Sequence, residues 1–334
     1  MRCWVEVSLA AIAQNYRAIR ALAPELELVP VVKANAYGHG MTPVAAALAA
    51  EGARWFAVSS FEEGLALRDA GIRGRILVMA DTGFDPVRHE GLTPVIHSLD
   101  EIPEGPYHLK IDTGMRRLGV LARPEEILDA IKRRPPEGLM THFASSADFL
   151  STQTAEQLAA FLPLVRASNA KWIHASSTNP LHFGLREAWF NMARPGLALY
   201  GYVSQPRGPA LELLRVTPAL TWKASVIAVK DVAAGERVGY GGTYRTPRAM
   251  RLAVIGAGYA DGLSRRLSSK PPFVGAISMD VSTIDISDTP DLRPGDAVTL
   301  LGPGRTAVDL ARMAGTIAYE VLAGISARVR RIYS

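Results

Sequence analysis

Cysteine is almost absent from this chain of 334 residues, which contains only Cys3. A single cysteine excludes an internal disulfide and a cysteine-rich metal site, so we expect no bound metal. So little cysteine is also typical of a reducing compartment. No run approaches the roughly 20 apolar residues of a membrane-spanning helix. Because Glu6, Gln14 and Asn15 interrupt the apolar core that a signal peptide requires, we predict a cytoplasmic protein with no membrane partner.

Long runs of one charge are missing as well. The chain carries 37 basic and 32 acidic residues, a net charge of +5, and both signs alternate along most of its length. The longest basic run is 132–134, and further basic clusters lie at 265–266 and 328–331. Nucleic-acid-binding proteins gather their basic residues, so this distribution indicates solvated surface and predicts no nucleic-acid partner. The chain also lacks a Walker or Rossmann fingerprint, which argues against a nucleotide ligand.

The chain does have an apolar content of 48%, enough for a large buried core. Its first two thirds alternate short apolar runs, typical of strands, with longer segments that have apolar residues at helical spacing. We predict strands at 26–32, 55–58, 75–79, 94–97, 107–111, 138–141 and 172–175, and helices at 43–50, 61–70, 124–132 and 152–167. About eight strands separated by helices over about 200 residues indicate a closed α/β barrel of the (β/α)8 type, and a doubly wound open sheet is the competing topology.

The last third has a different, strand-rich pattern. Predicted strands lie at 219–230, 237–240, 251–257, 273–286 and 297–301, and the one helix signal lies at 307–314. The change in pattern places a domain boundary at residues 215–218. We therefore predict a barrel domain at 1–216, followed by a mainly β C-terminal domain at 217–334. We expect the opening strand, 3–8, to pair with this second domain.

The first candidate for chemistry is Lys33, which ends an apolar strand and is followed by a glycine-rich turn. Functional residues of parallel barrels lie at the C-terminal ends of strands. A lysine in a desolvated site can lose its proton and attack a carbonyl to form a Schiff base. The alternative is an ordinary lysine in a surface loop. The position at a strand end does not by itself favour either interpretation.

Two further strand ends carry polar residues. Lys110 ends one strand, and the arginines that follow it can donate hydrogen bonds to an oxyanion or a phenolate. Capping of a helix by Asp112 or Thr113 is the alternative interpretation. His142 ends another strand, although a lone histidine is more often structural than catalytic. Lys33, Lys110 and His142 thus follow three different strands. Together they are stronger evidence for an active site than any one of them alone.

Hydroxyls and glycines follow the last two strands of the predicted barrel. Ser176, Ser177 and Thr178 lie after one strand, and Arg194 and Gly196 lie after the next. This is the usual phosphate-binding position of such barrels, where hydroxyls and exposed backbone N–H groups meet. The pattern predicts a phosphate-bearing ligand.

In the strand-rich part, Tyr259 lies between glycines in the segment 256–262, and a second polar segment follows at 278–280. A tyrosine in that setting is more readily exposed than one in a core. Its ordinary pKa of about 10 requires cationic neighbours if it is to act as a base near neutral pH. A turn with an aromatic side wall is an adequate alternative.

Together these segments resemble those of the alanine racemase family, whose members are pyridoxal-phosphate enzymes of fold type III. The resemblance runs from 31–40 to 318–321 and so covers almost the whole chain. Single-barrel pyridoxal-phosphate-binding proteins share a similar lysine strand but lack the second domain. The resemblance implies that Lys33 holds the cofactor covalently and acts as the base on the D-face. It also implies that Tyr259, reaching from the other subunit, is the base on the L-face.

The resemblance also implies the remaining contacts of pyridoxal 5'-phosphate. Arg194 would face the pyridine nitrogen, and since a guanidinium keeps its proton, the ring nitrogen would stay unprotonated. The other implied contacts are Tyr37, Ser177, Gly196, Leu197 and Tyr319 at the phosphate, Arg117 at the phenolate oxygen, His142 beside the ring, and Met279, Asp280 and Arg117 around the substrate.

The resemblance further points to carbamylation of Lys110, which would turn the amine into an anion able to pair with Arg117. If Lys110 stays an amine, these two cations need another anion.

The chain departs from the family pattern at three places. Ser177 is selected as the phosphate ligand from its spacing to Phe183, and Thr178 is the alternative. Arg116 stands where a glycine is common in the family. The chain is also short between 266 and 275, a segment that contributes to the active-site entrance in the family.

The function that follows from the resemblance is racemisation of L- and D-alanine by two bases, which supplies D-alanine for peptidoglycan. A homodimer with shared active sites is expected with it. An amino-acid racemase of broader specificity is one alternative, and a non-catalytic pyridoxal-phosphate-binding protein is another. A decarboxylase fits less well, because such enzymes usually place a carboxylate where Arg194 would lie.

Overall fold

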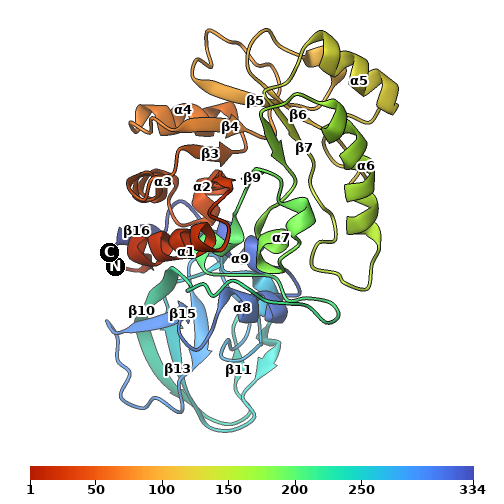
Figure 1. Ribbon diagram of the computed structural model, residues 1–334. Helices are drawn as coiled ribbons and strands as arrows, with labels where there is room; N and C mark the ends of the chain where they lie inside the picture. The colour runs from red at the N-terminus through yellow and green to blue at the C-terminus, as the bar shows by residue number, and fades with distance from the viewer. The chain divides into compact units, whose positions relative to one another are not determined.

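A computed structural model describes residues 1–334 (Figure 1). The chain divides into two compact units, which we call the barrel unit (Ala11–Ala36 and Met41–Thr217) and the C-terminal unit (Met1–Ala10, Tyr37–Gly40 and Pro218–Ser334). None of the helices combines the length and the apolar character that crossing a membrane requires.

The barrel unit is built on eight parallel strands. Six form one sheet in the order β3-β4-β5-β6-β7-β8, and β2 pairs with β9. Backbone hydrogen bonds close the ring: the amide of Val32 donates to Ala57 at 2.9 Å, and the amide of Arg194 donates to Ser176 at 2.9 Å. The strands are β2 (Glu27–Leu28), β3 (Trp55–Val58), β4 (Arg75–Val78), β5 (Leu92–Ile96), β6 (His108–Lys110), β7 (Gly138–Met140), β8 (Trp172–His174) and β9 (Met192–Ala193). This closure confirms the predicted barrel and shows that the open sheet was wrong.

The four predicted helices are all present, with ends that differ by a few residues at most. The helices are α1 (Leu9–Leu22), α2 (Lys33–Tyr37), α3 (Met41–Ala50), α4 (Phe61–Asp69), α5 (Pro124–Arg133), α6 (Gln153–Ala167) and α7 (Thr178–His182). The sequence pattern did not predict α1, α2 or α7. No α-helix connects β4 to β5 or β5 to β6, where the chain forms irregular turns and one short 3₁₀ helix.

Local sequence explains where these helices begin and how they pack. Ser60 caps α4, because its hydroxyl accepts the amide of Glu63. Proline opens α5, and the acidic residues of its first turn and basic residues of its last turn complement the helix dipole. Helices α5 and α6 lie outside the strands in Figure 1. Ile127 of α5 and Phe161 of α6 pack with Leu139 of β7 in one buried cluster.

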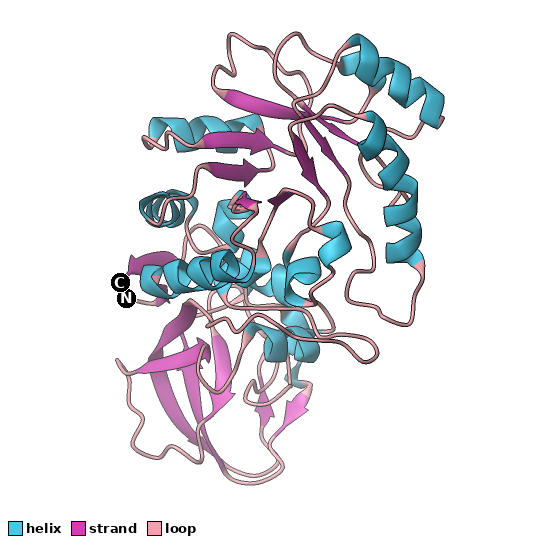
Figure 2. Ribbon diagram, in the orientation of Figure 1, coloured by secondary structure: helices cyan, strands magenta, loops and turns pink.

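The C-terminal unit is a mixed sheet, and Figure 2 shows that strands dominate it. The strand order is β14-β13-β10-β1-β16, and β15 also pairs with β10. Strand β1 runs antiparallel to β10 and parallel to β16. The elements are β1 (Cys3–Val7), β10 (Leu220–Val232), β11 (Arg237–Val238), β12 (Tyr244–Arg245), β13 (Met250–Ile255), β14 (Ser282–Asp285), β15 (Ala297–Leu301), α8 (Ala307–Ala314), α9 (Ala318–Ala323) and β16 (Arg330–Tyr333).

Two predictions for this unit were wrong. The expected strand at 273–286 is reduced to β14, because the chain turns at 278–281, where the amide of Ser278 donates to the carbonyl of Val281 at 3.1 Å. A second helix, α9, follows α8. Its six residues are too few to produce a readable helical period.

Candidate active site

An unusual backbone turn begins at Lys33, in the segment that follows β2. Ala34, Asn35 and Ala36 have φ angles of 51°, 53° and 53°. Residues with side chains seldom adopt this left-handed conformation in succession, because each costs roughly 1–2 kcal/mol. One hydrogen bond closes the turn, from the amide of Ala36 to the carbonyl of Val32 at 2.8 Å. The turn therefore depends on surrounding groups to hold it.

Glu63 is one of those groups. Its Oε1 accepts the amide of Ala34 at 2.7 Å, and its Oε2 accepts the amide of Ser59 at 2.7 Å. Glu63 itself is fixed at the start of α4, where its amide donates to the Ser60 hydroxyl. Hydrogen bonds to a carboxylate are shorter and stronger than bonds between neutral groups. The side chain thus ties the residue after Lys33 to the end of β3.

Cationic side chains lower one another's pKa at the C-terminal ends of the strands. Burial lowers the pKa of Lys33, the charge of Arg117 lowers it further, and Glu63 opposes both. Lys110 is 7% exposed. Burial, followed by the charge of Arg194, lowers the pKa of Lys110 to about 8. Both lysines therefore have a larger uncharged fraction, and the uncharged amine is the nucleophilic form.

Arg194 is buried inside the barrel. Its hydrogen bonds determine which ring nitrogen of the neighbouring His174 carries the proton. Its Nη1 donates to Nδ1 of His174 at 2.6 Å, and its Nη2 donates to the carbonyl of Thr141 at 2.9 Å. Nε2 of His174 lies 2.8 Å from Nδ1 of His108. A guanidinium only donates, so Nδ1 of His174 accepts. His174 therefore carries its proton on Nε2 and donates it to His108.

The histidines around Arg194 are neutral. Burial, followed by the charge of Arg194, lowers the pKa of His142 and of His174 well below the ordinary value. Burial lowers the pKa of His108 to about 3. Nδ1 of His142 lies 3.4 Å from Nη2 of Arg194. Neutral imidazoles add no further positive charge to a region that already holds several cations.

The two candidate phosphate hydroxyls differ in their surroundings. Thr178 is buried, and its hydroxyl accepts the amides of Gly196 at 3.2 Å and Ala198 at 3.3 Å. Ser177 precedes α7 as its N-cap residue, is partly exposed, and makes no capping hydrogen bond with its side chain. Leu197, the next residue of the predicted site, begins a short 3₁₀ helix. Only Ser177 of the two has a hydroxyl free of these internal bonds.

The segment after Lys110 is organised by Asp112. Oδ1 of Asp112 accepts the three successive amides of 114–116, at 2.9, 2.9 and 3.1 Å. Arg116 has a φ of 57°, in the left-handed region that favours glycine. The structure therefore explains why a glycine suits this position. Arg116 adopts the left-handed conformation despite its side chain, which makes that conformation less favourable than it is for glycine. Arg117, which follows, is exposed.

In the C-terminal unit, Tyr37 and Tyr319 lie together. Their ring centroids are 5.9 Å apart at an interplanar angle of 47°. Burial raises the pKa of Tyr37, and the neighbouring Tyr319 raises it further. The Tyr37 phenol therefore keeps its proton and can donate a hydrogen bond to an anion.

Tyr259 is 42% exposed and lies in a 3₁₀ turn, Tyr259–Asp261. The amide of Tyr259 donates to the carbonyl of Ser278 at 2.9 Å, and the amide of Ala260 donates to the carbonyl of Met279 at 3.0 Å. A Cβ on Gly258 would lie 2.3 Å from both carbonyl oxygens, so this approach requires glycine. We call 258–262 the tyrosine loop and 278–281 the methionine loop.

The methionine loop carries the other predicted substrate residues. Met279 is 54% exposed, and the side chain of Asp280 is 56% exposed. The structure thus places Tyr259, Met279 and Asp280 on two loops that lie side by side. It contains no group of three or more histidine, cysteine, aspartate or glutamate side chains that would hold a metal ion.

Two family models cover this arrangement of a barrel and a β-rich unit. The model of the alanine racemase N-terminal domain matches residues 7–204, and the model of the C-terminal domain matches residues 219–333. The chain belongs to the alanine racemase family.

Known alanine racemases are similar to this family member over their full length. The alanine racemase of Carboxydothermus hydrogenoformans is 38% identical over 366 aligned residues, which cover 99% of each chain. The alanine racemase of Syntrophobacter fumaroxidans is 38% identical and is aligned over 96% of this chain and 95% of its own. Because 366 positions exceed the 334 residues of this chain, the first relative has insertions that this chain lacks.

Solved alanine racemases share the fold. The enzyme from Streptomyces lavendulae has a TM-score of 0.90 and 34% identity, over 100% of this chain and 97% of its own. The enzyme from Bartonella henselae, solved with covalently bound pyridoxal phosphate, has a TM-score of 0.90 and 27% identity, over 100% of both chains.

The donor set of this family member fits pyridoxal phosphate. The Lys33 amine, with its lowered pKa, suits covalent attachment to an aldehyde. The Ser177 hydroxyl suits a phosphate oxygen, and the buried guanidinium of Arg194 can donate only, as an unprotonated ring nitrogen requires.

Several residues that organise the site have no signal in the sequence that points to this role. The pattern Ser60–Glu63 is a capping-box signal and marks the start of α4. It gives no sign that the carboxylate of Glu63 reaches Ala34, 29 positions away. The sequence indicates only that His108 and His174 belong to strands. No local pattern links them to Arg194.

Proposed function

We propose that this chain is an alanine racemase that interconverts L- and D-alanine on pyridoxal phosphate and supplies D-alanine for peptidoglycan. The observation that carries the proposal is the Lys33 amine of lowered pKa in the segment that follows β2, in a chain that also carries the exposed Tyr259. A cytoplasmic enzyme is proposed with it. We also propose 1–216, less its opening strand, as the cofactor-binding domain and 217–334 as the domain that carries Tyr259.

Two residues of the chain would move the α-proton of alanine. Pyridoxal phosphate, when bound, supplies an electron sink that makes this proton more acidic. Lys33 would remove or return the proton on the D-face, and Tyr259 would do so on the opposite L-face. Each residue acts as a base in one direction and as an acid in the other, so the two directions use the same pair of groups.

The remaining residues would bind and orient. Arg194 would donate toward the pyridine nitrogen and leave it unprotonated, because the guanidinium does not release its proton. The buried bonds of Arg194 to His174 and Thr141 support a fixed orientation for this contact. His142 would lie beside the ring, and Arg117 would donate to the phenolate oxygen.

Anion-binding groups of the chain would hold the phosphate and the substrate carboxylate. Ser177 is the better phosphate ligand than Thr178, since the hydroxyl of Thr178 already accepts two amides. The other proposed phosphate ligands are Tyr37, Gly196, Leu197 and Tyr319. Met279, with Asp280 beside it, and Arg117 would place the carboxylate of alanine.

Lys110 is proposed to carry a carbamate. Its pKa of about 8 supports this, because the neutral amine is the form that adds to carbon dioxide and then releases a proton. The product is an anion, which can pair with Arg117. An increase in intact mass by one carbon dioxide, absent in Lys110→Met, would demonstrate the modification.

A homodimer with shared active sites is proposed from the exposure of the tyrosine loop. Tyr259 and Met279 are 42% and 54% exposed, so these side chains are accessible to a partner subunit. A two-fold interface would let each protomer complete the other's site. Sedimentation under assay conditions tests the proposal, and a fully active monomer would refute it.

Two other functions make different predictions. A racemase of broader specificity would turn over larger amino acids at rates close to that of alanine. A binding protein without catalytic activity would be unaffected by Tyr259→Phe, which removes one oxygen atom.

The first experiment is coupled racemisation of L-alanine by the wild type, Lys33→Ala and Tyr259→Phe, with Lys132→Ala as a control on the exposed side of α5. We expect fast turnover in the wild type and the control, and a loss of about 100-fold or more in Tyr259→Phe. Lys33→Ala is expected to lose the absorbance of the bound cofactor as well. An inactive wild type that still shows this absorbance would refute the racemase proposal.

A further inference from the structure

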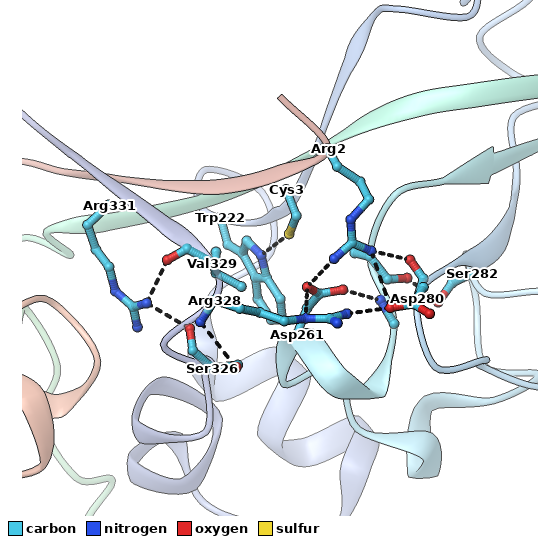
Figure 3. Close-up of polar contacts among 12 residues, drawn as sticks. Arg2, Cys3, Trp222, Asp261, Asp280, Ser282, Ser326, Arg328, Val329 and Arg331 are labelled. Atoms are coloured by element: carbon cyan, nitrogen blue, oxygen red, sulfur yellow. Dashed lines mark hydrogen bonds and ion pairs between the residues drawn. The ribbon is translucent and has the colours of Figure 1, made fainter.

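Four charged side chains of the C-terminal unit form a cluster, and Asp280, beside Met279, is the only one of them that the proposed reaction places near the substrate. Figure 3 shows this arginine–aspartate cluster, which consists of Arg2, Asp261, Asp280 and Arg328. The side chain of Asp261 is only 1% exposed. Its Oδ1 accepts Nη2 of Arg2 at 2.8 Å and Nε of Arg328 at 2.8 Å. A buried carboxylate requires such compensation.

Both arginines connect the tyrosine loop to the methionine loop. Arg328 binds Asp261 through Nε, and its Nη2 donates to Oδ1 of Asp280 at 2.8 Å. Arg2 binds Asp261 through Nη2, and its Nη1 donates to the backbone carbonyl of Asp280 at 2.6 Å. The second oxygen of Asp261 accepts the amide of Gly258 at 2.9 Å. The cluster therefore holds the chain on both sides of Tyr259.

The parts of the cluster come from distant regions of the sequence. Arg2 precedes β1, and Arg328 precedes β16, which pairs with β1. The two loops follow β13 and precede β14. Since β1 and β13 both pair with β10, the cluster anchors the loops to the sheet itself.

We propose that the arginine–aspartate cluster positions Tyr259 and Met279 for proton transfer at the substrate. This inference rests on the proposed function, in which Tyr259 is the base on one face of alanine. The phenol of Tyr259 is exposed, so its position depends on the backbone that carries it. That backbone is fixed by the two backbone hydrogen bonds between the tyrosine loop and the methionine loop. It is also fixed by Asp261, which Arg2 and Arg328 hold in place.

The planar fork of arginine is essential to this role. Arg328 reaches two carboxylates with two different nitrogen atoms, whereas a lysine has one ammonium group at the end of a flexible chain. Arg328→Lys therefore keeps the charge of the cluster and removes the connection between the loops. Arg330→Lys is the matched control, because Arg330 is an exposed arginine on β16 that lies outside the cluster.

The test uses the exchange of the α-hydrogen of D-alanine in D₂O by the full-length enzyme with its cofactor. Lys33 alone can remove this hydrogen and return deuterium to the same face, whereas conversion to L-alanine also requires Tyr259. In Arg328→Lys we expect the ratio of deuterium incorporation into D-alanine to conversion into L-alanine to rise at least tenfold. General destabilisation would lower both rates together and leave the ratio unchanged.

A second measurement follows the loops without the reaction. Backbone amide exchange of the full-length enzyme with its cofactor and without substrate should become faster at 258–260 in Arg328→Lys and stay unchanged in Arg330→Lys. Arg2→Lys is expected to act in the same way, and it replaces Arg328→Lys if that variant does not fold.

The outcomes separate the two proposals. An unchanged ratio and unchanged amide exchange in both cluster variants, with an active wild type, would overturn the positioning role alone. A wild type that neither exchanges nor converts alanine would overturn the proposed function and the positioning role that depends on it.

Discussion

Glu63 offers a sharp test of how the site is built, because a matched residue precedes it. Glu63→Gln keeps the shape of the side chain and replaces one acceptor oxygen by a donor. The Glu63 carboxylate accepts the amides of Ala34 and Ser59. In the variant, only one of these two amides would keep its hydrogen bond. Glu62 is exposed in the same first turn of α4, so Glu62→Gln loses the same helix-dipole interaction without losing these bonds.

The magnitude follows from the bonds and from the turn that they hold. A hydrogen bond to a charged group contributes about 1.5–3 kcal/mol, and water will replace part of it at the exposed Ala34. We therefore expect Glu63→Gln to lose about 1–2 kcal/mol of unfolding free energy. The left-handed turn at 34–36 costs roughly 1–2 kcal/mol per residue, so it loosens when this support is removed. A displaced Lys33 should then lower kcat about tenfold.

Urea unfolding and alanine turnover of the two variants measure these effects. Glu62→Gln should lose less than about 0.5 kcal/mol and keep its turnover. Equal losses in both variants would refute the reasoning, because the dipole interaction would then account for the whole effect. A stability loss in Glu63→Gln with unchanged turnover would show that the turn does not depend on the carboxylate.

Three further predictions follow from the burial of named side chains. His108 has a pKa of about 3 in the folded protein, so only the unfolded state binds its proton as the pH falls below about 6.5, and the contribution of His108 to folding stability should fall by about 2 kcal/mol between pH 7 and pH 5, in addition to the falls from His142 and His174. Urea unfolding at both pH values measures this fall, and an equally steep fall in His108→Gln would contradict it. Burial raises the pKa of Cys3 to about 11, so a thiol reagent should label the folded protein far more slowly than the protein in urea, and equal rates would be incompatible with that assignment. Ser177→Ala should weaken pyridoxal-phosphate binding about tenfold, which corresponds to about 1.4 kcal/mol, while Thr178→Val should chiefly lower the urea midpoint; the reverse result in a cofactor titration would make Thr178 the phosphate ligand.

The strands and helices of the barrel were predictable because their signals are local. The run Trp55–Val58 is buried at every position, and the pattern at 61–70 has a capping serine at its start. The region 273–286 was misread, since its apolar residues continue through a turn that depends on contacts with the tyrosine loop.

The candidate site residues were predictable where they follow a strand. Lys33, Lys110 and His142 each stand after an apolar run, and the C-terminal ends of parallel strands meet at one face of a barrel. Their electrostatic coupling was not visible in the sequence. The pKa of Lys110 depends on burial and on Arg194, which lies 84 positions further along the chain.

The sequence by itself determined the alternation of most barrel strands and helices, the change to a strand-rich C-terminal part, and the family to which the chain belongs. These depend on residue type and on spacing within a few positions. The tertiary structure alone decided which carboxylate supports the turn at Lys33, which nitrogen of His174 carries the proton, and which arginines hold Asp261. Arg2 and Asp261 are 259 positions apart and still form one ion pair. Such pairs depend on how the whole sheet is assembled, because β1 and β13 flank the same central strand, and no local pattern records that arrangement.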